Sequence, residues 1–173
     1  MSSAFLKNER ADDPVVIPAR APLPPGTTNY VTYRGLSLLR EELAALEQEH
    51  AHTQIHELDE TERMRKLALL NGQIGALNQR IATAKVVDNH EQPHHEVRFG
   101  ATVHLKSQST KHGKANRQLT IVGVDEADAT NGRIAFTAPI ARLMLGKSVG
   151  DSIALRTIKG ENVLKITDIS YEG

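Results

Sequence analysis

The stretch MRKLALLNGQIGALNQRIATA, residues 64–84, decides the fold of the first half of the chain. Its apolar residues recur at alternating intervals of three and four, which places them on one stripe of a helix. The same spacing occurs upstream, at Leu36, Leu39, Leu43 and Leu46. Because a helix with a single apolar stripe needs a partner to bury it, we expect the two stretches to pair with each other.

An antiparallel arrangement aligns the two stripes along their length and sets Leu46 opposite Leu70. The turn between the helices then falls at residues 58–59. This predicts an antiparallel two-helix coiled coil over residues 32–88, with arms ~37 Å long at 1.5 Å per residue. Thr32 is the expected N-cap of the first helix.

Segments without periodicity flank this hairpin. Residues 1–31 contain several prolines, which interrupt helices and strands, so they are expected to form a flexible leader. Residues 89–96 contain Pro93 and read as a linker to a separate module.

The pattern changes to an alternation of apolar and polar residues in residues 97–173, beginning with Val97, Phe99, Ala101, Val103 and Leu105. Four further short apolar runs follow and predict strands. Between the third and fourth runs, the segment from Pro139 to Leu145 is expected to form one short helix that ends at Gly146. The fold class is therefore α+β, with a helical hairpin followed by a curved antiparallel sheet and one short helix.

Composition excludes several classes of function. The 173-residue chain has a net charge of zero and no cysteine, which disfavours nonspecific nucleic-acid binding and excludes cysteine-based metal sites. No apolar run approaches the length of a membrane span, so we expect no membrane association and a cytoplasmic location. Pairs and clusters of histidines lack a third ligand at a defined spacing, and no nucleophile motif is present, so no metal site and no independent enzyme are expected.

Four sequence blocks in the second half carry a family resemblance. They are VRFGATV (97–103), IVGVDEAD (121–128), the run from Gly132 to Asp151, and ITDISY (166–171). In order and spacing they resemble the C-terminal domain of the bacterial Gre-type transcription elongation factors, of the GreA/GreB kind. The resemblance implies an FKBP-like fold for residues 97–173 without isomerase activity. It extends to the hairpin, where AKVVD (84–88) and TYRG (32–35) are similar to the family's coiled-coil end and start.

The resemblance implies a partner and a mode of action. Gre-type factors insert the coiled coil into the secondary channel of RNA polymerase and dock the C-terminal domain on its rim. In the cleavage factors, two acidic residues at the coiled-coil tip help the polymerase hold a second Mg²⁺ for hydrolysis of the transcript. The matching tip residues here are Asp59 and Glu62, followed by Arg63 where the family has asparagine. Hard Mg²⁺ prefers oxygen ligands, so a carboxylate delivered to such a site suits this chemistry.

Further residues are candidates by position. The basic residues Arg63, Arg65 and Lys66 follow the tip and are candidates for contact with RNA or the channel; helix-surface ion pairs such as Glu62 with Lys66 are the alternative. The resemblance implies polymerase contacts at the C-terminal module, for which the candidates are Asp125, Glu126, Pro139, Ile140, Ala141 and Arg142.

Both arms of the hairpin look about six or seven residues shorter than in the cleavage factors, a loss of ~10 Å in reach. We therefore expect a monomeric factor that binds bacterial RNA polymerase, and through it the nucleoid, with weak cleavage stimulation. It would meet nascent RNA and DNA only within the transcription complex, and it would use the polymerase's Mg²⁺ and active site rather than its own. The alternatives are a regulator or inhibitor that occupies the channel without cleavage, and an interaction module for a different partner.

Overall fold

The computed structural model describes residues 14–108, 116–158 and 160–172. Their contacts group into two compact units. One contains the described residues up to Arg20 together with Leu39–Ala82, and the other contains Ala21–Leu38 with the described residues from Thr83 onward. None of the helices in the described ranges is long and apolar enough to cross a membrane.

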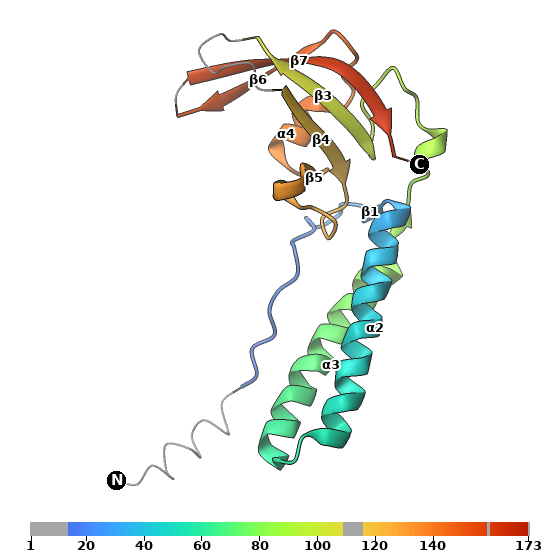
Figure 1. Ribbon diagram of the computed structural model, residues 1–173, viewed down its shortest axis with the longest axis vertical. Helices are drawn as coiled ribbons and strands as arrows, with labels where there is room; N and C mark the ends of the chain where they lie inside the picture. The colour runs from blue at the N-terminus through green and yellow to red at the C-terminus, as the bar shows by residue number, and fades with distance from the viewer. Residues whose placement is uncertain (1–13, 109–115, 159, 173) are drawn as a thin grey trace. The chain divides into compact units, whose positions relative to one another are not determined.

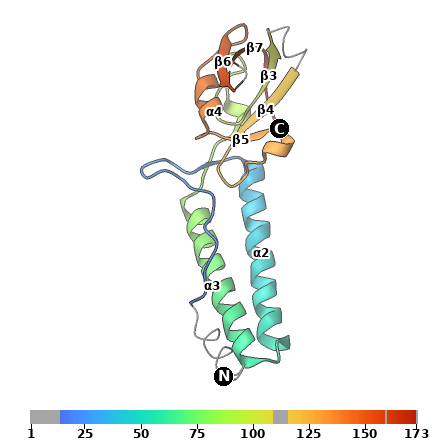
Figure 2. The ribbon, with the colours of Figure 1, turned by 90° about the vertical axis from the view of Figure 1, so that its left-hand side faces the viewer.

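The first unit is built on a helical hairpin. Helices α2 (Tyr33–His56) and α3 (Glu60–Thr83) run side by side in opposite directions, joined by a short turn at residues 57–59 (Figures 1 and 2). Leu39, Leu70 and Leu77, which belong to the two predicted stripes, are buried. The antiparallel hairpin predicted from the apolar spacing is thus confirmed, because burial of both stripes is what stabilises two such helices.

The second unit contains a five-stranded sheet in the order β5-β4-β3-β7-β6. Its strands are β3 (Ala101–Ser107), β4 (Asn116–Val122), β5 (Arg133–Ala135), β6 (Ser152–Thr157) and β7 (Gly160–Tyr171). Three of the four pairings are antiparallel, as predicted, whereas β5 pairs with β4 in parallel. The polypeptide between β4 and β5 carries the 3-10 helix η3 (Ala129–Asn131), which gives it the length to return β5 in the same direction as β4.

The sheet curls around the short helix α4 (Pro139–Met144), which is the helix predicted there (Figure 1). Ala141 and Met144 face the sheet and are completely buried against its inner side. The same core contains Val103 and Leu105 from β3 and Ile166 from β7. The alternation of apolar and polar residues along these strands therefore produces one buried face.

A second, two-stranded sheet was not predicted. Strand β1 (Tyr30–Val31) pairs in parallel with β2 (Lys85–Val86), directly before α2 and directly after α3. Tyr30 also contacts Phe99 and Phe136, with ring centroids 5.8 and 5.7 Å away. These three rings are half of the six aromatic residues in the chain. Aromatic packing thus ties β1 into the second unit.

The predicted leader differs from the structure at its C-terminal end. Residues 21–31 belong to the second unit, and Asn29 and Val31 are buried. Proline content argued against helices and strands there, but it does not prevent an irregular segment from packing. Linker residues 89–91 form the 3-10 helix η1 (Asn89–Glu91), capped by the Asp88 side chain, which accepts from the His90 backbone N–H.

Candidate functional site

The turn between α2 and α3 presents the candidate acidic tip. Asp59 is the N-cap of α3: its Oδ1 accepts a hydrogen bond from the Glu62 backbone N–H at 3.0 Å. The Asp59 carbonyl also accepts from the Arg63 backbone N–H at 2.9 Å. Both acidic side chains are exposed. Asp59 and Glu62 therefore lie within one helical turn at the tip, and one Asp59 oxygen is already engaged in the cap.

Two of the basic candidates brace this turn. Lys66 Nζ lies 2.5 Å from Glu57 Oε2, and Arg63 Nη1 donates to the Glu57 carbonyl at 3.3 Å. The hydrogen bond from Lys66 lowers the pKa of the Glu57 carboxyl, and the same contact raises the pKa of Lys66. The ion pair of Lys66 thus forms with Glu57 rather than with Glu62, the partner considered from helical spacing. Arg65, the third basic candidate, is half-buried.

The histidines and acidic residues near the tip and the linker form pairs in the described part of the chain. Within the described ranges no group of three or more histidine, aspartate or glutamate side chains is arranged to bind a metal. His52 and His56 stack with ring centroids 4.4 Å apart, and His94 packs edge-on against Tyr171 at 5.5 Å.

Helix α4 presents only part of the predicted contact segment. Pro139 begins the helix and is exposed, as is Arg142, whereas Ile140 is half-buried and Ala141 is fully buried. Arg142 forms no side-chain ion pair or hydrogen bond with the part of the chain that the structure describes. Its neighbour Leu143 has 43% of its surface exposed. A partner could therefore touch Pro139, Arg142 and Leu143, while the Ala141 side chain is held in the core.

The two acidic candidates before β5 are less accessible. Asp125 is half-buried and already has an interaction within the chain. Glu126 is buried, with 2% of its side chain exposed. Its carboxylate accepts from the Thr32 hydroxyl at 2.5 Å, from Arg34 at 2.8 Å and from Arg133 at 3.2 Å. Glu126 therefore has the environment of a structural anion rather than of a surface contact.

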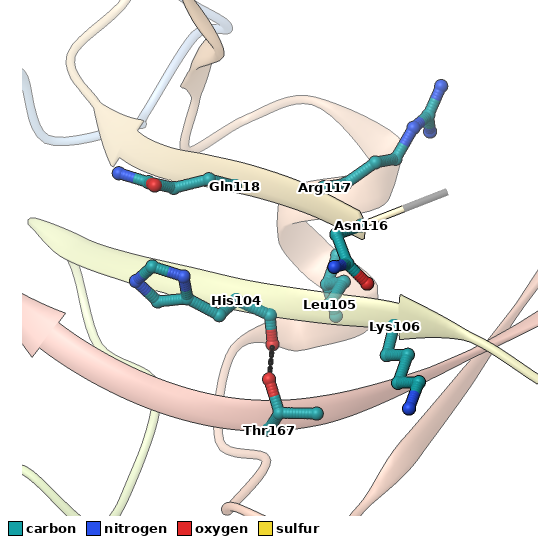
Figure 3. Close-up of a pocket in the computed structure, with 7 residues that line it drawn as sticks. All are labelled: His104, Leu105, Lys106, Asn116, Arg117, Gln118 and Thr167. Atoms are coloured by element: carbon teal, nitrogen blue, oxygen red, sulfur yellow. Dashed lines mark hydrogen bonds between the residues drawn. The ribbon is translucent and has the colours of Figure 1, made fainter. Parts of the chain in front are cut away.

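A shallow pocket of about 360 Å³ lies on the polar side of the sheet. It is lined by His104, Leu105, Lys106, Asn116, Arg117, Gln118 and Thr167. Thr167 donates its hydroxyl to the His104 carbonyl at 3.2 Å (Figure 3). The charged ends of Lys106 and Arg117 point in opposite directions in this view (Figure 3). The two cations thus do not converge on one ligand position, and we assign no site there.

Comparison with known proteins identifies the family. Residues 92–171 match the family described as "Transcription elongation factor, GreA/GreB, C-term". The transcription elongation factor GreA of Azorhizobium caulinodans is 35% identical over 130 residues, which cover 75% of this chain and 81% of that protein. The chain belongs to the GreA/GreB family of transcription elongation factors. GreA of Methylobacterium nodulans is 31% identical over 156 residues, 83% of this chain and 97% of that protein.

Solved structures of GreA/GreB proteins also match. A GreA/GreB factor from Nitrosomonas europaea is 20% identical and covers 82% of this chain and 98% of its own, with a TM-score of 0.42. The GreA factor homolog 1 (Gfh1) of Thermus thermophilus is 19% identical and covers 85% of this chain and 100% of its own, with a TM-score of 0.38.

The Glu126 cluster is a side-chain network of this GreA/GreB family member that sequence reasoning missed. Thr32 is the predicted N-cap of α2, and its hydroxyl accepts from the Gly35 backbone N–H at 2.9 Å while it donates to Glu126. A methyl group at Gly35 would lie 2.8 Å from Glu126 Oε1. The glycine in the TYRG segment was thus the available signal, because it marks a backbone that another group approaches closely.

Proposed function

We propose that this GreA/GreB family member binds bacterial RNA polymerase at the secondary channel and regulates elongation. The observation that carries the proposal is the pair of exposed side chains Pro139 and Arg142 on α4, within the segment that matches the family; the Arg142 guanidinium makes no ion pair with the described residues. In this proposal the C-terminal module docks on the channel rim and the hairpin enters the channel. The chain acts as a monomer and meets RNA and DNA only inside the transcription complex.

The docking surface can be tested at Arg142. If its guanidinium forms a desolvated contact with an acidic group of the polymerase, Arg142→Ala weakens binding by about 2 kcal/mol or more, roughly 30-fold. The matched control is Arg156→Ala, which removes an exposed arginine from β6. Affinity for core polymerase is measured by fluorescence anisotropy at two salt concentrations. Equal affinity of the Arg142 variant and the parent would exclude this residue from the interface.

The tip supplies carboxylates for chemistry that the polymerase performs. Inside the channel, Asp59 and Glu62 would approach the polymerase active site, where an added oxygen ligand helps to retain a second Mg²⁺ and a water nucleophile. The chain itself contributes no complete active site, so any RNA cleavage is catalysis by the polymerase. Arg63 and Lys66 are bound to Glu57 in the free protein and would support the tip shape as well as contact RNA.

Reach limits this chemistry. Each helix has 24 residues, ~36 Å at 1.5 Å per residue. The resemblance to the cleavage factors implies arms that are each about six or seven residues shorter than theirs, a loss of ~10 Å. A carboxylate that far from its metal cannot reach the ~2.1 Å of direct Mg²⁺ coordination.

Cleavage of backtracked transcripts shows whether the length of the arms or the identity of the tip residues limits activity. We expect weak or no stimulation by the parent protein, cleavage by a variant with one heptad added to each arm, and none by that long variant carrying Asp59→Asn and Glu62→Gln. Adding a heptad to each arm keeps the apolar stripes in register. Robust cleavage by the parent would refute the length argument. Without cleavage, the protein acts by occupying the channel, as a regulator or an inhibitor.

A different partner for the C-terminal module is the second candidate function. The burial of Ala141 and Glu126 favours it in one respect, because it leaves a smaller exposed contact surface than the sequence predicted. A pull-down of core polymerase distinguishes the two, since a module for another partner would not retain polymerase. We favour the channel factor, because the chain belongs to the GreA/GreB family, and we therefore expect polymerase to be retained.

A further inference from the structure

The proline-rich segment before the second unit makes specific contacts with the helical hairpin. Arg20 forms a two-pronged ion pair with Glu42 of α2, at 2.8 and 3.0 Å. Only 20% of the Arg20 side chain is exposed, against 45% for Glu42. Two parallel hydrogen bonds fix the orientation of a guanidinium on a carboxylate. This end of the segment therefore has a defined position on α2.

The second contact is on α3. Ile17 lies directly on the backbone of Gly72, where a methyl group would come within 1.9 Å of Ile17 Cδ1. No side chain larger than hydrogen fits at position 72 while Ile17 stays in place. Gly75, one turn further along α3, has no atom within 4 Å of the corresponding position. Gly72 is thus the point on α3 where the segment rests.

Prolines restrict the segment that makes these contacts. Pro18 follows Ile17 directly, and a residue before proline avoids the helical conformation. Residues 14–20 have no helix or strand, and Val15 is half-buried. Little chain entropy is lost when such a stiff segment docks, because proline has already restricted it.

We propose that residues 14–20 are a strap that docks on α2 and α3 and must leave them before the hairpin enters the polymerase channel. This proposal rests on the proposed function. A rod inside a channel faces a wall on every side, and a helix pair is already about 20 Å across its two ~10 Å cylinders. An extended strand adds ~5 Å to that thickness. The docked strap therefore competes with insertion.

The strap is held weakly enough to move. Its ion pair is partly exposed and Ile17 retains 43% of its surface, so each contact contributes little and we take the docked and undocked states to be close in free energy. If only the undocked state binds, the apparent dissociation constant rises in inverse proportion to the undocked fraction. For a strap docked in about 80–90% of molecules, releasing it strengthens binding about 5- to 10-fold.

The two helix glycines provide a matched pair of variants. Gly72→Ala and Gly75→Ala add the same methyl group and the same gain in helix propensity to α3. Only Gly72→Ala places its methyl group against Ile17, at 1.9 Å from Cδ1 and 2.7 Å from Cγ1, so that the Ile17 side chain must shift. Arg20→Glu breaks the ion pair, and combining it with Glu42→Arg restores an ion pair of reversed polarity.

Docking is measured first on the free protein. The chain has no cysteine, so a spin label on Val16→Cys is unique, and Val16 is 83% exposed and tolerates it. We expect broadening of the backbone amides around Gly72, retained with Gly75→Ala and lost with Gly72→Ala. The absence of broadening in the otherwise unaltered chain would overturn the docked strap.

Affinity for core polymerase is measured next. We expect Gly72→Ala and Arg20→Glu to bind about 5- to 10-fold more tightly, Gly75→Ala to bind like the parent, and the charge-reversed pair to return toward the parent. Loss of broadening without any gain in affinity would overturn the competition. If no variant binds polymerase, the proposed function itself fails and the competition with it, while the spin-label result still reports docking separately.

Discussion

Replacing Glu126 tests the cluster that anchors the start of α2 in the second unit. The carboxylate is 2% exposed and accepts from one hydroxyl and two guanidinium groups. In Glu126→Gln the amide oxygen still accepts from the Thr32 hydroxyl, but the amide NH₂ takes the place of Oε2 and faces both Arg34 and Arg133 as donor against donor. In Glu126→Ala all three contacts are lost.

The contacts differ in their expected contribution. Arg34 is 50% exposed, so its ion pair contributes less than about 1 kcal/mol. Arg133 is 16% exposed, and a largely buried hydrogen bond to a charged group contributes about 1.5–3 kcal/mol. We therefore expect the free energy of unfolding to fall by about 2 kcal/mol in Glu126→Gln and by about 3–4 kcal/mol in Glu126→Ala.

Urea unfolding followed by tyrosine fluorescence reports on the unfolding of the second unit. All three tyrosines, Tyr30, Tyr33 and Tyr171, lie in the second unit, and the chain has no tryptophan. Glu172→Gln is the control: it removes the other carboxylate on Arg133, but Glu172 is 47% exposed and its loss costs less than about 1 kcal/mol. A Glu126→Gln variant within 0.5 kcal/mol of the parent would refute the assignment of this cluster as structural.

Two further predictions concern the tip and the C-terminal strand. Asp59→Ala removes the N-cap of α3 and lowers the free energy of unfolding of the hairpin by about 1 kcal/mol. Asp59→Asn keeps an acceptor for the Glu62 N–H and lowers that free energy by only a few tenths of a kcal/mol. Thermal unfolding followed by circular dichroism measures both, and equal losses would contradict the cap. Burial raises the pKa of Tyr171 above its ordinary 10.0, so the folded state holds this proton more tightly and stability falls as pH rises above 10. Tyr171→Phe loses the hydrogen bond to the Glu96 carbonyl, which lowers the free energy of unfolding by about 1 kcal/mol at neutral pH. The same variant makes stability fall less steeply at alkaline pH, as measured by urea unfolding between pH 8 and 11. An unchanged fall would assign it to other groups.

Sequence reasoning predicted the elements better than their partners. The spacing of apolar residues identified the hairpin, and Thr32 was recognised as the cap of α2, because both depend on local periodicity and short-range hydrogen bonds. The parallel pairing of β5 with β4, and of β1 with β2, was not predicted. Alternation shows which face of a strand is buried but carries no information on the direction of its neighbour.

The candidate site was predicted less completely, for a related reason. The run Asp125–Asp128 has the composition of a solvated loop, and its sequence does not reveal that two arginines and a threonine surround Glu126. Ala141 was grouped with Arg142 as a contact, although successive helix residues point in different directions. The strap was also missed, since a proline-rich composition predicts the absence of helix and strand but not the presence of a docking surface.

Competition for polymerase tests the central claim most directly. A fluorescently labelled sample of the full chain is bound to bacterial core RNA polymerase, and unlabelled GreA of Methylobacterium nodulans is added in increasing amounts. If the protein occupies the secondary channel, GreA displaces it completely and the two never share one polymerase. A complex that contains both proteins, or no binding of this chain to core polymerase, would contradict the account.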